Sequence, residues 1–171
     1  FLLRGMPFVD LAFLRRCDLQ GNVITYHRRK TSRKLTVVVG KEAMEIIQKY
    51  MYAIPDSPYL FPIIQNPGKD EYGQYARMLR LQNYRLTQVA NILGIRDRLS
   101  TYTARHTWAT TALRQNYNSS LICDAMGHSS VKVTETYFQP YRDDEVNRMN
   151  SSLITYILSK KKRGTDKKIR S

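Results

Sequence analysis

Three short segments of this sequence combine hydroxyl, imidazole and cationic side chains in a way that suits one reaction. A basic run covers residues 27–34, a Tyr-Thr-Ala-Arg-His run covers residues 102–106, and the histidine of a Gly-His pair at 127–128 precedes Tyr137 by nine residues. A hydroxyl that attacks a phosphodiester needs cationic donors, because negative charge develops on the non-bridging oxygens. The three segments together therefore indicate phosphoryl transfer on a nucleic-acid backbone.

Each of these residue types has a defined use in such a reaction. Arginine stays charged and donates two parallel hydrogen bonds to phosphate oxygens, whereas histidine can donate to an oxygen or accept a proton near neutral pH. A lysine whose pKa is lowered by cationic neighbours can protonate a departing 5′-oxygen. A tyrosine nucleophile would conserve the bond energy as a phosphotyrosine ester, so the strand could be rejoined without ATP, a cofactor or a metal ion.

The order and spacing of these motifs resemble the catalytic domain of tyrosine recombinases, the family of phage integrases, Xer recombinases and the integrases of conjugative transposons. The resemblance covers about residues 1–158 and is strongest in three segments: 104–110, 126–129 and 134–137. It implies a mainly helical fold with a small antiparallel sheet. It also implies site-specific DNA recombination, that is integration, excision or inversion, through a 3′-phosphotyrosine intermediate.

The resemblance assigns a role to single residues of this sequence. Tyr137 takes the place of the nucleophile and Arg105 that of a phosphate-binding arginine. The Gly-His histidine is His128, and the hairpin lysine that protonates the leaving oxygen is Lys30. Lys30 shares its segment with other cations that compete for this assignment: Arg28, Arg29, Arg33 and Lys34.

Two positions depart from the family pattern. Tyr102 stands three residues before Arg105, where the family often has histidine, so a phenol would donate to the phosphate and proton transfer would shift to His128. Pro7 occupies the place of the family's first arginine, which leaves Arg4, about one helical turn earlier, as its replacement. The alternative is a site that works with fewer cations.

Other conspicuous side chains have a structural interpretation. We expect His106 to bond backbone or a buried acid in the core, Trp108 to pack in the core, and His27 to lie on the hairpin surface. Asp10 is expected to pair with a neighbouring arginine rather than to catalyse.

The charge balance favours a polyanionic partner. The 171 residues hold 28 Lys and Arg against 14 Asp and Glu, a net charge of +14, of which residues 160–171 supply +6 and leave +8 on the rest. Because each neutralised phosphate releases condensed counterions, double-stranded DNA is the expected partner. A charge that serves solubility, or an acidic protein partner, is the alternative. The resemblance further implies a homotetramer on paired DNA sites.

Length and composition suit one soluble domain with a real core, since 42% of the residues are hydrophobic. The apolar start without an initiator Met suggests a fragment of a longer protein. Two cysteines are too few for a disulfide framework and fit a reducing cytoplasm. The sequence has no apolar run of about 20 residues, so no membrane association is expected. The resemblance places the protein in a bacterial cytoplasm, with the nucleoid.

Local sequence patterns predict the elements that must position the motifs. Residues 23–26 and 35–39 are rich in β-branched side chains and are expected to form a hairpin with a basic tip. Helices are expected at 8–14, 42–52, 72–94, 103–116, 119–126 and from 143 onward. The four prolines between residues 55 and 67 indicate a loop. We expect a catalytic domain over residues 1–159 and a disordered basic tail over residues 160–171.

Two other functions share these sequence features. A type IB topoisomerase would use the same residues to relax DNA without site preference. A DNA-binding module with decayed catalysis would explain the departures at Tyr102 and Pro7.

Overall fold

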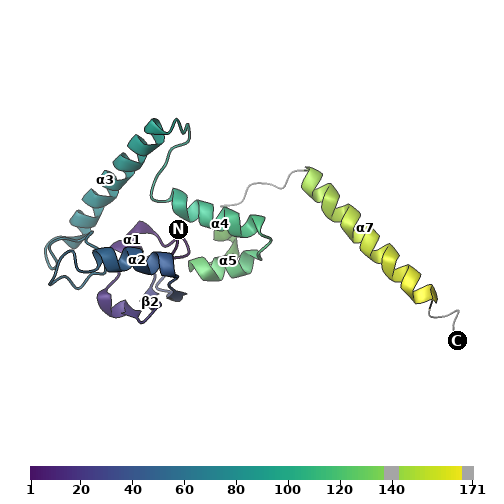
Figure 1. Cartoon of the computed structure of the whole chain (residues 1–171), viewed down its shortest axis with the longest axis horizontal. Helices are drawn as coiled ribbons and strands as arrows, with labels where there is room; N and C mark the ends of the chain where they lie inside the picture. Colours follow the sequence, from purple (N-terminus) through teal and green to yellow (C-terminus); the bar gives the residue numbers. More distant parts are fainter. Residues whose placement is uncertain (137–142, 167–171) are drawn as a thin grey trace. The chain divides into compact units, whose positions relative to one another are not determined.

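A computed structural model describes residues 1–136 and 143–166, and the chain divides into two compact units, Phe1–Phe138 and Gln139–Ser171. The first unit contains a three-stranded sheet and most of the helices, as Figure 1 shows. The second contains a single described helix. The assignment of residues 1–159 to one domain stays a prediction.

The sheet is antiparallel in the order β1-β2-β3, with β1 at Leu19–Gln20, β2 at Val23–His27 and β3 at Lys34–Val38. The predicted hairpin is confirmed: Tyr26 pairs with Leu35 and His27 with Lys34, so the basic segment forms its turn. His27 is exposed, as expected. The sequence did not predict β1, because a strand of two residues is too short to show an alternating pattern.

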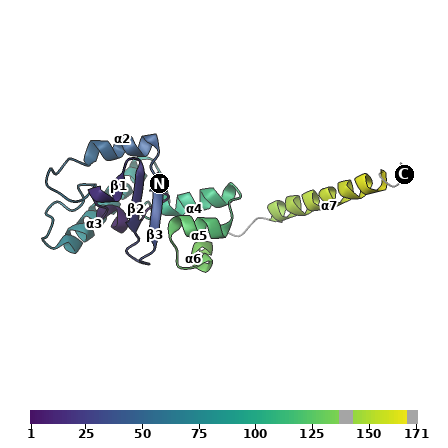
Figure 2. The same cartoon turned by 90° about the horizontal axis from the view of Figure 1, so that it is seen from below.

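The main core lies between this sheet and α2, which spans Lys41–Tyr50 and covers one face of the strands (Figure 2). Alternate residues of the hairpin point into it, and Ala43 and Ile47 of α2 meet them. The buried strand residues are Ile24, Tyr26, Leu35 and Val37. The alternation along the hairpin follows from strand geometry, and the buried positions of α2 recur at helical spacing.

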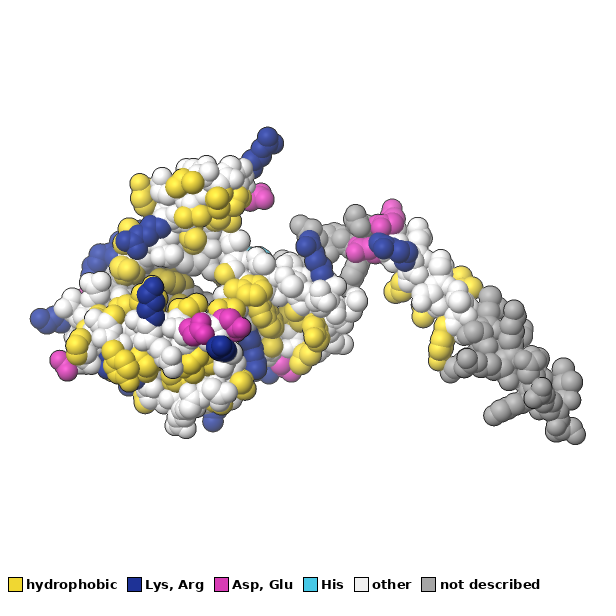
Figure 3. All heavy atoms as spheres, viewed as in Figure 1, with side chains coloured by type: hydrophobic (Ala, Val, Ile, Leu, Met, Phe, Trp, Pro, Cys, Tyr) yellow, Lys and Arg dark blue, Asp and Glu magenta, His cyan; other side chains and the backbone are white. Residues whose placement is uncertain are grey.

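Helices α1 and η1 come before the strands in the chain, and α3 follows α2. α1 covers only Phe8–Ala12, shorter than predicted, and buries Asp10 and Ala12. A 3-10 helix, η1, follows at Arg16–Asp18. α3 spans Glu71–Ile92 and begins at Asp70, whose side chain accepts a hydrogen bond from the Gly73 amide. Figure 3 shows apolar side chains exposed on α3.

A second, smaller core holds the helices that carry the motifs. α4 spans Thr103–Arg114, α5 spans Ser119–Met126 and α6 spans Val131–Glu135. Their buried residues are Ala109, Ile122 and Met126, and Trp108 packs against them, which confirms the core role predicted for this tryptophan.

The helix of the second unit, α7, spans Asp143–Asp166 and has three acidic residues in its first turn. The helix begins at the predicted Asp143 and continues through residues 160–166, and the assignment of residues 160–171 to a separate basic tail stays a prediction. Lysine and arginine are good helix formers, and a helix needs no apolar periodicity to continue. Nowhere in the described ranges is a helix long and apolar enough to cross a lipid bilayer.

Candidate active site

A cleft of about 420 Å³ opens between the hairpin turn, the start of α1, α3 and the segment that joins α5 to α6. Three of the predicted site residues line it: Lys30, Tyr102 and His128. Tyr137 lies outside the described residues. Arg4 is not among the residues that line the cleft.

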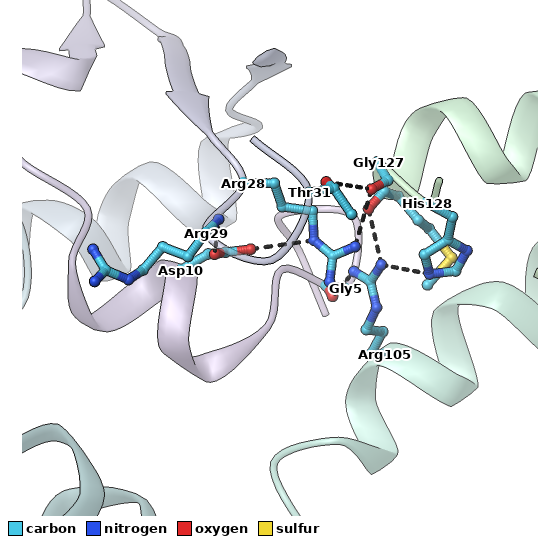
Figure 4. A network of polar contacts seen from close by, with 9 residues as sticks. Gly5, Asp10, Arg28, Arg29, Thr31, Arg105, Gly127 and His128 are labelled. Carbon is cyan, nitrogen blue, oxygen red and sulfur yellow. Dashed lines mark hydrogen bonds and ion pairs between the residues drawn. The ribbon is translucent and has the colours of Figure 1, made fainter. Parts of the chain in front are cut away.

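Arg105 is the largest fully buried side chain of the described residues, with only 2% of its surface exposed. It lies in α4, and its guanidinium is held from three directions (Figure 4). Nη1 donates to the Gly5 carbonyl at 2.8 Å, and Nη2 donates to the Met126 carbonyl at 2.8 Å. Nη2 also contacts Nε2 of His128 at 2.7 Å. A buried arginine fixed in this way forms a preorganised cationic centre.

His128 is 3% exposed, and its two ring nitrogens have different partners. Nε2 faces Arg105, and Nδ1 lies 2.7 Å from the hydroxyl oxygen of Thr134. Burial, the largest cause, and the positive charges of Arg105, Arg28 and Lys30 lower the pKa of His128 to about 4. The ring is therefore neutral at pH 7.

Two glycines allow the backbone to approach these side chains. Gly5 has a φ of +62°, and a Cβ there would lie 3.0 Å from the Cα of Arg105. Gly127, at φ +65°, ends α5, and a Cβ there would lie 2.8 Å from a methyl carbon of Leu35. A side chain at Gly5 would crowd the backbone of α4, and the positive φ at both positions would strain any residue other than glycine.

The hairpin turn is attached to the Gly127–His128 segment by side chains that flank Lys30. Arg28 Nη1 and the Thr31 hydroxyl donate to the Gly127 carbonyl at 3.0 and 3.1 Å. Arg33 donates to the His128 carbonyl at 3.1 Å and forms an ion pair with Asp124 at 2.8 Å. Lys30 itself is exposed at the edge of the cleft. We call this set of bonds from Arg28, Thr31 and Arg33 the hairpin clasp.

Arg28 is the site residue that sequence reasoning missed. It was expected as one of several cations of the exposed turn, yet it is 7% exposed and lines the cleft beside Arg105 (Figure 4). Its Nε lies 3.4 Å from a carboxylate oxygen of Asp10, whose other oxygen accepts from the Arg29 amide at 2.9 Å. The pairing predicted for Asp10 is thus confirmed. The predicted pairing of Asp10 was the signal that could have identified a buried arginine, since a buried acid on α1 needs a cation as its partner.

The remaining predicted residues have mixed outcomes. Tyr102 is exposed just before α4, and its ring meets that of His106 edge to face at 4.8 Å. His106 is exposed, so its predicted place in the core is wrong. The buried face of α4 is formed by Arg105 and Ala109 instead. Arg4 is half-buried with a φ of +55°, in the turn that ends at Gly5.

Sequence comparisons identify relatives over most of the chain. The family model described as "Phage integrase family" matches residues 5–143. A tyrosine recombinase of Pseudothermotoga lettingae is 32% identical over 153 residues, which cover 89% of this chain and 53% of that protein. Tyrosine recombinase XerC of Thermodesulfovibrio yellowstonii is 25% identical over 146 residues, 79% of this chain and 43% of that protein. The chain thus spans about half the length of these relatives.

Solved structures share the fold. XerA recombinase superposes with a TM-score of 0.64 at 21% identity, over 87% of this chain and 53% of that one. The Tn1549 transposon integrase in complex with transposon right end DNA gives a TM-score of 0.60 at 17% identity, over 90% and 56% of the two chains. The predicted fold class, mainly helical with a small antiparallel sheet, is confirmed.

Proposed function

Because the chain belongs to the phage integrase family, we propose that it is the catalytic part of a tyrosine recombinase that cuts and rejoins double-stranded DNA at specific sites. The observation that carries this proposal is the buried Arg105–His128 pair behind a cleft edged by Lys30. This arrangement supplies a fixed cation behind the cleft, and a neutral imidazole and an exposed proton donor in its lining.

In the proposed reaction the Tyr137 oxygen attacks a scissile phosphorus atom. A bond forms between that oxygen and phosphorus while the bond from phosphorus to the 5′-oxygen breaks, which leaves a 3′-phosphotyrosine. Lys30 gives a proton to the departing 5′-oxygen, and the phenol proton passes to water, because Nε2 of His128 already accepts from Arg105. A 5′-hydroxyl from a second DNA strand then reverses the step and exchanges the strands.

The guanidinium of Arg105 is proposed to stabilise the negative charge on the non-bridging oxygens, with Tyr102 as a further donor at the edge of the cleft. The residue that replaces the family's first arginine at the Pro7 position is a separate question. Arg4 stays the prediction from sequence, whereas the position of Arg28 in the cleft wall makes it a second candidate.

Charge and family suggest the partners. The net charge of +14 suits double-stranded DNA, and we propose a homotetramer on paired sites, in a bacterial cytoplasm with the nucleoid. The exposed apolar side chains of α7, which include Val146, Met149 and Leu153, would then pack on a neighbouring copy (Figure 3).

A trapped covalent complex tests the nucleophile. A duplex that carries the target site, nicked so that the leaving nucleotide diffuses away, should form a protein–DNA adduct that survives denaturing detergent, also in excess chelator. Tyr137→Phe should abolish the adduct and keep DNA binding, whereas Tyr141→Phe, four residues away in sequence, should retain it. An adduct on the Tyr137→Phe protein would assign the nucleophile elsewhere.

Variants of the two arginines decide between the candidates for the missing cation. Arg4→Ala should slow cleavage by about a hundredfold if Arg4 does that work, the usual order for loss of one donor to a developing oxyanion. Normal cleavage by this variant, together with a comparable loss in Arg28→Lys, would assign the role to Arg28. In the second variant the charge stays but the bidentate geometry is lost.

The two alternative functions have their own outcomes. The relatives and structures reported above are recombinases and a transposon integrase, which disfavours a type IB topoisomerase. Relaxation of a supercoiled plasmid that lacks the target site would nevertheless support it. DNA binding without any adduct would support a module whose catalysis has decayed.

A further inference from the structure

Thr134 lies in α6, three residues before Tyr137 in sequence, and none of its surface is exposed. Its hydroxyl oxygen is 2.7 Å from Nδ1 of His128. We propose that Thr134 is a positioning residue for strand cleavage: its hydroxyl accepts the Nδ1 proton of His128 and so keeps Nε2 as the hydrogen-bond acceptor for Arg105. This inference rests on the proposed function.

The hydrogen-bond donors in the cluster determine the tautomer. A guanidinium has only donors, and Arg105 Nη2 lies 2.7 Å from Nε2 of His128, so Nε2 must offer its lone pair. A neutral imidazole carries one proton, which must therefore be on Nδ1. The Thr134 hydroxyl is the group that receives it, and as a hydroxyl it can both accept and donate.

The opposite tautomer would disrupt the site. A proton on Nε2 would point at an N–H of Arg105 across 2.7 Å, and the two donors would repel. Arg105 would then lose one of its three anchors. Cationic groups face the ring from α4 (Arg105) and from the hairpin (Arg28, Lys30). These charges disfavour a doubly protonated ring, so protonating both nitrogens does not resolve the repulsion.

The surroundings explain why threonine suits this position. Its methyl group fills buried space as valine would, while its hydroxyl supplies the acceptor that valine lacks. Loss of a buried hydrogen-bond acceptor costs free energy, so replacing the hydroxyl weakens the preference for a proton on Nδ1 and favours its transfer to Nε2. Thr134→Val therefore changes the preferred tautomer with little change of shape, and Thr134→Ser keeps the acceptor.

Nitrogen-15 NMR of the imidazole rings reads the tautomer without any DNA. The chain has only three histidines, so His27→Gln and His106→Gln variants assign the His128 signals. At pH 7 we expect wild-type His128 to carry its proton on Nδ1, and Thr134→Ser to keep it there. In Thr134→Val we expect a mixture or a proton on Nε2. A wild-type proton on Nε2, or an unchanged tautomer in Thr134→Val, overturns the proposal.

Adduct formation on the nicked duplex measures the consequence. Loss of a group that orients a catalytic residue commonly costs about ten- to a hundredfold, so Thr134→Val should slow cleavage by that factor. Thr134→Ser should stay within about threefold of wild type, which is less than the loss of one typical hydrogen bond would cause. Thr110→Val is the matched control, because its hydroxyl donates to the His106 carbonyl within α4. Equal losses in Thr134→Ser and Thr134→Val would overturn the proposal. An absent wild-type adduct would instead contradict the proposed function, whereas the NMR experiment would still test the tautomer of His128.

Discussion

The two sides of the cleft are built differently. On the side of α4, α5 and α6, the side chains of Arg105, His128 and Thr134 are almost fully buried and bonded to one another. On the hairpin side, Lys30 is exposed in a turn, two residues before Ser32, which has a φ of +53°. The difference indicates a division of labour: charge stabilisation needs donors that are fixed beforehand, whereas a proton donor must reach the leaving oxygen.

The hairpin clasp joins the two sides. It is anchored on the carbonyls of Gly127 and His128, so the backbone of the buried side determines where the exposed turn lies. If the two sides have distinct roles, variants on the buried side should affect cleavage of every substrate. Variants on the hairpin should matter only while the leaving group needs a proton.

The largest effect is expected for Arg105→Lys. An ammonium group cannot reach the Gly5 and Met126 carbonyls and the His128 ring together, so the cation loses its fixed position. Cleavage on the nicked duplex should fall by about a thousandfold. A control at Arg114, in the last turn of the same helix, should cleave normally as Arg114→Lys. Cleavage by Arg105→Lys close to wild type would contradict preorganisation on this side.

Lys30→Ala should reduce cleavage by about a hundredfold, the usual contribution of a positioned general acid. A substrate with sulfur in place of the scissile 5′-oxygen has a leaving group that needs no proton, and should restore the rate. Lys34→Ala, in β3 of the same hairpin, is the matched control. If Lys34→Ala is the variant that the sulfur substrate rescues, the acid has been assigned to the wrong lysine.

Loosening the clasp should have a smaller effect. The double variant Thr31→Val, Arg33→Ala removes the Thr31 bond to the Gly127 carbonyl, the Arg33 bond to the His128 carbonyl and the ion pair with Asp124. The bond from Arg28 to the Gly127 carbonyl stays. Each of the two hydrogen bonds contributes about 1 kcal/mol, so cleavage should fall by about thirtyfold. The sulfur substrate should be cleaved at the wild-type rate. A loss of the same size on both substrates would show that the clasp supports the buried side as well.

The smallest expected effect is the change of thermal stability with pH that His128 causes. The pKa of His128 is about 4 in the folded chain, below its ordinary 6.5, so the unfolded chain binds the proton more readily. The stability that neutral His128 contributes is complete above pH 6.5 and is lost as pH falls toward 4. The melting temperature should therefore decrease between pH 7 and pH 5. The decrease should be smaller in His128→Asn, and a His128→Asn profile parallel to wild type would contradict the lowered pKa.

Local sequence patterns predicted most of the elements. Helices α2 to α5 follow from helical spacing, the hairpin follows from two β-branched segments around a polar run, and Gly127 ends α5 where predicted. These signals depend on neighbours along the chain. The two-residue strand β1 and the continuation of α7 through residues 160–166 were not predicted. A pairing partner determines the first, and helix propensity without an apolar face determines the second.

For the site, the sequence by itself determined which residue types were present and in what order: the Arg105 motif, the Gly-His pair, and the lysine of a basic turn. Only the tertiary structure decided which cation of that turn is buried, since Arg28 faces Asp10 of α1 and Lys30 does not. The tautomer of His128 also depends on the fold, because its two ring nitrogens meet groups from α4 and α6. Burial and hydrogen-bond direction arise from residues far apart in the chain, and no local pattern encodes them.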